Sequence, residues 1–231
     1  MTEHRDSTTR QEKPDIRGRF ITLEGIDGCG KSTQAVRLAE RPRQAGVSVL
    51  ETREPGGTEI GKALRAVLLS PHSAGLAPSA ELLLFLADRV QHLSELIRPA
   101  LQRGETVICD RYHDATEAYQ RFGRGLDFGP YRGLIDSEVM TTPPDLTLWL
   151  DLPPEAAAER MAARRAAQEA PAQDAEARFD TAEMAFHQRV SAGYRALHAE
   201  HPARIVRIDA ELGIAEMEAR IYDQVSARFR V

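Results

Sequence analysis

The chain has 231 residues, of which 42% are hydrophobic and 28% are charged, and its formal net charge is −5. This composition lies near the globular average, and the negative charge argues against a general nucleic-acid-binding protein. Its two cysteines, Cys29 and Cys109, are too few for a disulfide framework and lack the spacing of a metal site, as expected for a protein of the reducing cytoplasm. No break in composition divides the chain, so we predict a single domain over residues 18–231.

Residues 1–17 are polar and charged throughout and contain no apolar stretch of signal-peptide length. We therefore predict a disordered N-terminal extension without a targeting segment. No apolar run elsewhere approaches the roughly 20 residues needed to span a bilayer, so no membrane partner is expected.

A phosphate-binding motif follows the first predicted strand. The apolar run that begins at Phe20 predicts a buried strand, and residues 25–32 then match the pattern GxxxxGK[ST]. Small residues allow successive backbone N–H groups to turn toward a polyphosphate, and the positive end of the next helix adds to the attraction. A chance glycine turn is the alternative, although strand, loop and helix occur in the required order. Lys31 would reach the β and γ phosphates and Ser32 would hold Mg²⁺, within a predicted cradle of Gly25, Ile26, Asp27, Gly28, Cys29, Gly30, Lys31, Ser32 and Thr33.

The next predicted helix covers residues 32 to about 41, where Pro42 ends or kinks it, and a short strand follows over residues 47–52. This strand delivers Arg53 and Glu54 at its carboxyl end, the edge at which open α/β sheets bind ligands. The two charged residues fit groups held at a binding site, and they also fit a solvated salt bridge.

A long helix is predicted over residues 81–101 from its apolar stripe. Phe85 and Arg89 lie one turn apart on the flank of this stripe. The pair fits an aromatic platform beside a hydrogen-bond donor, which suits a flat heteroaromatic ring that bears a carbonyl group. The pattern fits equally well if Phe85 packs in the core and Arg89 is a surface charge.

Residues 106–109 predict a third strand, which ends in Asp110 and Arg111. An aspartate at the tip of an apolar strand is typical of the Walker B arrangement, in which a carboxylate holds Mg²⁺ near the phosphates. Arg111 beside it can neutralise a second phosphate group. Polar side chains at helical spacing can reach the same cleft from the next segment: Thr116, Tyr119 and Gln120.

The alternation of strands and helices continues after a glycine-rich loop that is predicted over residues 121–133. The remaining strands are predicted over residues 145–152, where Trp149 is most simply a core residue, and 204–208. Strands that alternate with helices indicate a parallel sheet with its site at the carboxyl ends, so we predict an α/β fold. The helices between and after these strands are predicted over residues 154 to about 170, 181–199 and from about 214 onward.

Two arginines on the predicted helix after residue 154 have no acidic residue three or four positions away. Arg160 and Arg164 form a like-charge pair that destabilises a helix by roughly 0.2 to 0.5 kcal/mol, which favours an external anion as their partner. Solvated surface arginines would give the same pattern. Residues 169–177 are polar and interrupted by proline, which predicts a mobile flap.

Taken in this order, the motifs resemble those of the thymidylate kinase family, whose members phosphorylate dTMP with ATP. The resemblance spans residues 19–231 and implies a P-loop NTPase fold in which helices flank a five-stranded parallel sheet, in the nucleoside monophosphate kinase arrangement with a small lid at about residues 160–180. It also implies ATP and Mg²⁺ as cofactors and a homodimer. The matching segments are FITLEGIDGCGKST at 20–33, TREPGGT at 52–58, ELLLFLADR at 81–89, CDRYHDATEAYQ at 109–120, GRGLD at 123–127 and PDLTLWLDL at 144–152.

By position, the resemblance implies roles for individual residues. Phe85 would stack on thymine and Arg89 would hydrogen-bond its carbonyl group, while Arg53 and Arg111 would clamp the dTMP phosphate. Asp27 would lie near the sugar and phosphate of dTMP. The base and sugar pocket would be lined by Thr116, Tyr119 and Gln120.

The resemblance also implies a catalytic arginine in the lid, because family members with a small residue at the position of Cys29 carry theirs there. Arg164 is the first candidate among these arginines. The others are Arg160, Arg165 and Arg178. The chain departs from the family pattern at positions that bear on the pocket wall and the lid, which are Ala115, Arg121, Phe122 and Ala177.

The expected activity is in-line transfer of the γ-phosphoryl group of ATP to dTMP, in dTTP synthesis. A kinase of another nucleoside monophosphate is one alternative, and a nucleotide-dependent switch that does not transfer phosphate is another. The second phosphate-binding group, Arg53 with Arg111, argues against a switch that does not transfer phosphate. The expected catalytic residues are Asp27, Lys31, Arg53, Arg111 and Arg164.

Overall fold

The computed structural model describes residues 18–167 and 183–229. At its centre is a sheet of five parallel strands in the order β2-β3-β1-β4-β5. This arrangement confirms the predicted α/β fold with a five-stranded parallel sheet. Because β1 lies between β3 and β4, the strand order reverses at its carboxyl end, the place where such sheets bind ligands. The strands are β1 (Phe20–Glu24), β2 (Val49–Arg53), β3 (Thr106–Asp110), β4 (Leu146–Asp151) and β5 (Ile205–Asp209).

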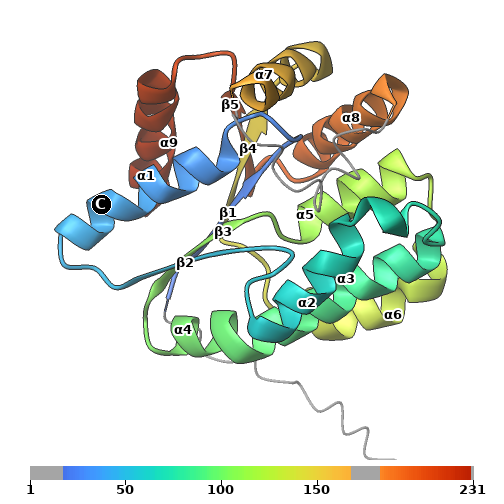
Figure 1. The fold of residues 1–231 in the computed structure, drawn as a ribbon. Coiled ribbons are helices and arrows are strands. Elements are labelled where there is room, and N and C mark those ends of the chain that lie inside the picture. The colour runs from blue at the N-terminus through green and yellow to red at the C-terminus, as the bar shows by residue number, and fades with distance from the viewer. Residues whose placement is uncertain (1–17, 168–182, 230–231) are drawn as a thin grey trace, which may run out of the picture.

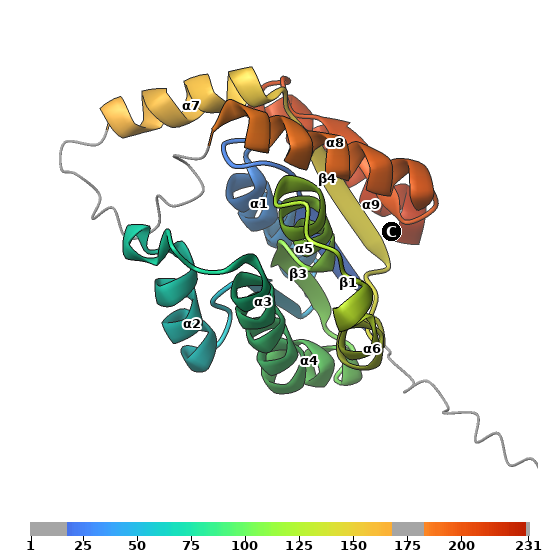
Figure 2. The same ribbon diagram turned by 90° about the vertical axis from the view of Figure 1, so that its right-hand side faces the viewer.

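Helices cover both faces of the sheet (Figure 1). On one face lie α1 (Lys31–Gln44) and α9 (Ile214–Phe229), and on the other lie α3 (Pro78–His92), α5 (His113–Thr116) and α8 (Met184–Glu200). The remaining helices are α2 (Glu59–Leu69), α4 (Arg98–Gln102), α6 (Arg132–Leu134) and α7 (Pro154–Ala166). Figure 2 shows α7 beside α8 at one end of the sheet.

The predicted long helix over residues 81–101 begins earlier, at Pro78, and is interrupted between α3 and α4 by a π-helical turn, Leu93–Ile97. Pro99 causes the interruption, since it has no N–H to donate to the preceding turn. The N–H of Arg98 bonds the carbonyl of Leu93, five residues back. Further π-helical turns are Glu117–Gly123 and Ile135–Val139, and short 3₁₀ turns are Pro71–Ser73 and Gly129–Tyr131.

Three other segments differ from the sequence predictions. The helix α1 continues through Pro42 to Gln44. The helix α2 is not predicted from the sequence; Thr58 caps it, since its Oγ1 accepts a hydrogen bond of 2.9 Å from the N–H of Gly61. The predicted loop over residues 121–133 is wrong for most of its length, because the chain is helical up to Gly123 and again from Gly129.

Gly123 explains this error, because its role is close packing rather than a turn. A Cβ at this position would lie 2.7 Å from the Phe186 ring of α8, so only glycine lets the two segments approach. The predicted N-terminal extension, residues 1–17, and the predicted flap, residues 169–177, lie outside the described residues.

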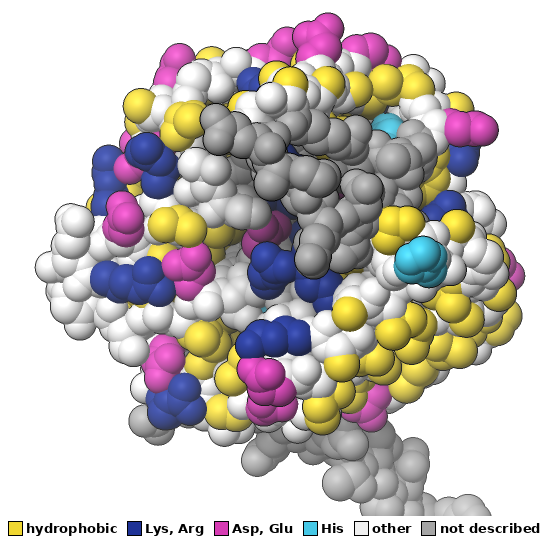
Figure 3. Space-filling view, in the orientation of Figure 1, with side chains coloured by type: hydrophobic (Ala, Val, Ile, Leu, Met, Phe, Trp, Pro, Cys, Tyr) yellow, Lys and Arg dark blue, Asp and Glu magenta, His cyan; other side chains and the backbone are white. Residues whose placement is uncertain are grey.

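The surface carries exposed hydrophobic side chains on α2 and α3, among them Ile60, Val67 and Leu83. Figure 3 shows hydrophobic side chains gathered where these helices lie. Among the described residues, no helix combines the length and the apolar character needed to cross a membrane.

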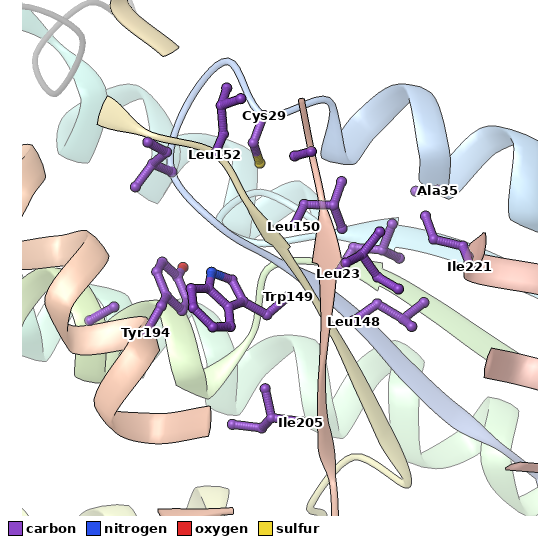
Figure 4. Packing of buried hydrophobic residues seen from close by; sticks show 14 of the residues in the cluster. Leu23, Cys29, Ala35, Leu148, Trp149, Leu150, Leu152, Tyr194, Ile205 and Ile221 are labelled. Atoms are coloured by element: carbon purple, nitrogen blue, oxygen red, sulfur yellow. The ribbon is translucent and has the colours of Figure 1, made fainter. Parts of the chain in front are cut away.

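The largest hydrophobic cluster lies between the sheet and its flanking helices (Figure 4). Trp149 is 2% exposed, and its ring stacks on Tyr194 of α8 with the centroids 6.4 Å apart. This confirms Trp149 as a core residue. The packing anchors α8 against β4, so that Tyr194 reaches the end of β1, where the phosphate-binding motif begins.

Candidate active site

A cleft of about 530 Å³ opens where β1, β2 and β3 end, with α3 and α7 contributing to its walls. Figure 3 shows Lys and Arg side chains gathered at the centre of this face of the molecule. The cleft brings together most of the residues predicted for the site: Asp27, Gly28, Gly30, Lys31, Ser32, Thr33, Arg53, Phe85, Arg89, Asp110, Arg111, Thr116, Tyr119, Gln120 and Arg164.

Three residues of the predicted cradle do not line the cleft: Gly25, Ile26 and Cys29. Ile26 and Cys29 are 3% and 0% exposed and pack in the hydrophobic core. Gly25 has a φ of 138°, and a Cβ there would lie 2.5 Å from the carbonyl oxygen of Leu150. These residues shape the loop, and α1 begins directly after it at Lys31, which directs the positive end of the helix at the cleft.

Lys31 folds back over the cradle loop. Its Nζ donates hydrogen bonds to the carbonyl oxygens of Gly25 at 3.1 Å and Ile26 at 2.9 Å, and the residue is only 6% exposed. The ammonium group is thus held on the floor of the cleft by backbone acceptors. Its third N–H donates to Cys29 Sγ at 3.7 Å, a weak acceptor that an incoming phosphate oxygen can replace.

Ser32 and Asp110 meet across the loop from neighbouring elements. The Ser32 hydroxyl donates to Asp110 Oδ2 at 2.5 Å. The other carboxylate oxygen, Oδ1, is buried and has no hydrogen-bond partner among the described residues. A buried acceptor without a donor is costly, and hard divalent cations prefer such carboxylate and hydroxyl oxygens. The pair therefore fits a Mg²⁺ site.

Arg111 is fixed at the tip of β3 in a left-handed backbone conformation, with a φ of 72°. Its guanidinium donates to Asp27 Oδ1 at 2.6 Å, to the Tyr119 hydroxyl at 3.0 Å and to the Gly25 carbonyl at 3.0 Å. The Tyr119 hydroxyl in turn donates to Asp27 Oδ2 at 2.9 Å. Burial raises the pKa of Asp27, but the charges of Arg111 and Lys31 outweigh it, and the net pKa lies below its usual range. Asp27 is therefore an anion in the cleft.

Arg53 reaches the same cleft from β2. It lies beside Asp110 in the register of the two adjacent parallel strands. Sequence reasoning alone does not predict that Arg53 lies beside Asp110, because more than 50 residues separate β2 from β3. The structure thus places Arg53 and Arg111 around the cleft that also holds Lys31 and Asp110.

The far end of the cleft contains Phe85, Arg89, Thr116 and Gln120. Arg89 is 2% exposed, so the interpretation of Arg89 as a surface charge is wrong. Its Nε donates to Glu54 Oε2 at 2.7 Å and its two terminal nitrogens donate to Thr116 Oγ1 at 2.7 Å and to the Tyr112 carbonyl at 2.8 Å.

Glu54 is also buried, at 3% exposure. The alternative interpretation, in which Glu54 takes part in a solvated salt bridge, is therefore wrong. Its second oxygen, Oε1, pairs with His92 Nδ1 at 2.9 Å, and His92 Nε2 pairs with Thr52 Oγ1 at 2.7 Å. Burial alone raises the pKa of Glu54, but Arg89 and His92 lower it below its usual value. An ionised Glu54 only accepts hydrogen bonds, so it requires a proton on His92 Nδ1.

Several residues of the cleft are not found by sequence reasoning. Arg65 on α2 lines the cleft, and its guanidinium donates to the Pro55 carbonyl at 2.9 Å. The helical spacing of Ile60 and Val67 with Leu68 is the signal that would have revealed α2. The sequence places Glu54 at the site, but its pairing with Arg89 and His92 has no signal in the sequence, because these partners come from a distant segment.

Of the departures from the family pattern, Ala115 lines the cleft. Phe122 instead packs against α8, where a Cβ on Gly193 would lie 2.9 Å from it. Among the candidate lid arginines, Arg160 and Arg164 line the cleft from α7. The Arg165 side chain, Ala177 and Arg178 lie outside the described residues.

Glu24 is the last residue of β1, directly before the cradle loop, and is fully buried. It accepts hydrogen bonds from the Tyr112 N–H at 2.7 Å and from the Tyr194 hydroxyl at 2.8 Å, and this hydroxyl also pairs with Arg111 at 3.3 Å. Burial, followed by the charge of Asp114, raises the pKa of Glu24 from 4.5 to about 7, while Arg111 opposes the shift.

The free energy of unfolding is expected to fall as the pH rises through about 7, by up to roughly 3 kcal/mol relative to a Glu24→Gln variant. Folded Glu24 keeps its proton to a higher pH than the unfolded chain does. Its contribution is therefore complete below about pH 4.5 and is lost as the folded group ionises. Urea unfolding of both proteins from about pH 5 to about pH 8 measures the difference. Parallel pH profiles of the two proteins would contradict this expectation.

Comparisons with known proteins identify the family of this chain. The thymidylate kinase family model matches residues 23–221. The thymidylate kinase of Solidesulfovibrio magneticus is 51% identical over 191 residues, which cover 83% of this chain and 90% of that protein. The thymidylate kinase of a Synechococcus strain is 48% identical and covers 90% of this chain and 95% of its own length.

Among solved structures, the thymidylate kinase of Ehrlichia chaffeensis superposes with a TM-score of 0.71 at 32% identity, over 90% of this chain and 98% of that one. Its likeness confirms the predicted P-loop type of fold. With the family model matching most of its length, and with relatives close to half identical, this chain belongs to the thymidylate kinase family.

Proposed function

We propose that the protein transfers the γ-phosphoryl group of ATP to dTMP, forming ADP and dTDP for dTTP synthesis. One observation carries the proposal: Lys31, on a phosphate cradle, lines the same cleft as the guanidinium groups of Arg53 and Arg111. Two anion-binding groups that border one cleft suit two nucleotides that meet at their phosphates.

At the donor end, the cradle backbone and Lys31 bind the phosphates of ATP. Ser32 and Asp110 would hold Mg²⁺, which when bound neutralises charge on the transferred phosphoryl group. Lys31 and a lid arginine, for which Arg164 is the first candidate, stabilise charge on the γ-phosphoryl oxygens. No strong general base is needed, because the acceptor oxygen of dTMP is already anionic.

At the acceptor end, Arg53 and Arg111 clamp the dTMP phosphate. Asp27 holds Arg111 in place through the bond of 2.6 Å and lies near the sugar and phosphate. Phe85 stacks on the thymine ring and Arg89 donates to one of its carbonyl groups. The rest of this pocket is lined by Thr116, Tyr119 and Gln120. Positioning of the two nucleotides in line is the main contribution of these residues to the rate.

We further propose a cytoplasmic homodimer. The exposed hydrophobic side chains of Ile60, Val67 and Leu83 on α2 and α3 support an interface there. Sedimentation of the purified chain tests the homodimer, which has twice the 25.6 kDa mass of one chain.

An acceptor panel tests the proposed activity. ADP formation is measured with dTMP, dUMP, CMP, AMP and GMP in turn, each with ATP and Mg²⁺. The proposal predicts ADP formation that depends on the acceptor and is fastest with dTMP. Faster turnover of another acceptor would identify a kinase of that nucleotide, and tight ATP binding without acceptor-dependent ADP would identify a switch.

A further inference from the structure

A buried carboxylate stands behind the far end of the cleft. Glu81, on α3, is 0% exposed. Its Oε1 accepts a hydrogen bond of 2.9 Å from Gln120 Nε2, and Arg124 contacts its Oε1 and Oε2 at 3.3 Å and 3.2 Å. The Arg124 guanidinium compensates the buried negative charge. Glu81 itself does not line the cleft, whereas Gln120 does.

This contact determines which way the Gln120 amide faces. A carboxylate accepts hydrogen bonds and donates none, so only the NH₂ end of the amide can be turned toward Glu81. The assignment of the amide oxygen and nitrogen follows from this partner. The carbonyl end, Oε1, is then the end of the amide that is left for a ligand in the cleft.

The guanidinium of Arg89 offers hydrogen-bond donors to the cleft, whereas the Gln120 carbonyl offers an acceptor. It carries only donors, and Glu54, Thr116 and the Tyr112 carbonyl hold it at 2.7 to 2.8 Å. The far end of the cleft therefore offers one fixed donor, from Arg89, and one fixed acceptor, from Gln120. Such a pair is complementary to a ring edge on which a carbonyl group is adjacent to an N–H.

Pyrimidine bases differ at this edge. Thymine and uracil present a carbonyl oxygen beside the N3 proton, and both match the pair. Cytosine presents an amino group beside an unprotonated N3, so an amino donor would meet Arg89 and a lone pair would meet the Gln120 carbonyl. Sites that leave buried polar groups unpaired reject such a ligand strongly.

We infer that Glu81 is a positioning residue that sets the selectivity for thymine and uracil over cytosine, by fixing the Gln120 amide with its carbonyl toward the base. The inference rests on the proposed function and deepens it. It assigns the discrimination to a residue that does not touch the substrate. A neutral amide in place of Glu81 can donate as well as accept, so the Gln120 amide is then able to turn around.

The test compares purified full-length wild type with Glu81→Gln. Values of kcat/KM are measured for dTMP and dCMP at saturating ATP, with the inhibition constant of dCMP against dTMP where turnover of dCMP is too slow to follow. The ratio of kcat/KM for dTMP to kcat/KM for dCMP is expected to fall by about tenfold or more in Glu81→Gln. The change is expected mainly in the KM values of the two acceptors. If Glu81 had only a structural role, kcat/KM would fall equally for both acceptors and the ratio would stay unchanged.

Glu117→Gln is the matched control, because it makes the same change at a buried carboxylate in the same π-helical turn as Gln120. Glu117 is 5% exposed and pairs with His113 and Arg121 instead. The control is expected to keep the selectivity ratio within about twofold of wild type. An equal loss of selectivity in Glu117→Gln would overturn the inference.

The double variant Glu81→Gln/Gln120→Glu provides a second test in case the Glu81→Gln protein folds poorly. It exchanges the two groups, so that the amide donates to the carboxylate and the carboxylate presents a fixed acceptor to the cleft. It is expected to keep a preference for dTMP over dCMP. Loss of this preference in a folded double variant, or an unchanged ratio in Glu81→Gln, would refute the inference while leaving the kinase activity of the wild type in place. A wild type that forms no ADP with dTMP would refute the proposed function itself.

Discussion

Removal of the Arg164 guanidinium is expected to lower kcat by at least about 10³-fold, because a single arginine that stabilises the transferring phosphoryl group supplies about 10³ to 10⁵ in rate in P-loop enzymes. The KM for dTMP is expected to change by less than about threefold, since the contact forms chiefly in the transition state. Steady-state kinetics of Arg164→Ala with ATP and dTMP measures both quantities.

Arg160→Ala provides the matched control for this prediction. Arg160 lies one helical turn earlier on α7 and lines the same cleft. A large loss of kcat in Arg160→Ala, with little change in Arg164→Ala, would assign the catalytic role to Arg160. Wild-type activity in both variants would exclude both residues, and the role would then pass to Arg165 or Arg178.

Replacement of Arg111 by methionine is expected to reduce kcat/KM for dTMP by about 10³-fold or more, because the acceptor phosphate loses one of its two proposed arginine partners. It is also expected to destabilise the fold by about 3 kcal/mol, because Asp27 and Tyr119 lose the cation that they hold. Acceptor kinetics and urea unfolding of Arg111→Met measure the two effects separately.

The double variant Asp27→Asn/Arg111→Met separates stability from function. Removal of the uncompensated Asp27 charge is expected to restore most of the lost stability and none of the acceptor affinity. Arg111→Lys keeps the charge but not the planar fork, and it is expected to recover only part of kcat/KM. Full activity in either variant would show that Arg111 does not clamp the acceptor phosphate.

The contrast between Lys31 and Arg89 shows where sequence reasoning succeeds. The placement of Lys31 follows from eight consecutive residues, since strand, glycine loop and helix N-terminus form a site by local geometry alone. The sequence around Arg89 fits a surface charge equally well, because periodicity gives only the direction of a side chain on its own helix. Its burial results from the packing of α3 against the ends of β2 and β3.

The glycines between residues 121 and 133 show where sequence reasoning fails. Gly123 resembles a turn residue, yet it lies in a helical segment and allows close contact with Phe186 of α8. A glycine at a helix crossing and a glycine in a loop have the same local sequence signature. Only the position of a partner more than 60 residues away distinguishes them.

From the sequence by itself, the parallel α/β fold, the phosphate cradle and the charged residues at the tips of β2 and β3 could be determined, because each depends on spacing along a short segment. The tertiary structure alone decided that Glu54 and His92 support Arg89, and that Glu81 orients Gln120. These contacts join segments 35 to 39 residues apart. Their hydrogen bonds are directional and require buried partners within about 3 Å, a condition that only the packed fold imposes.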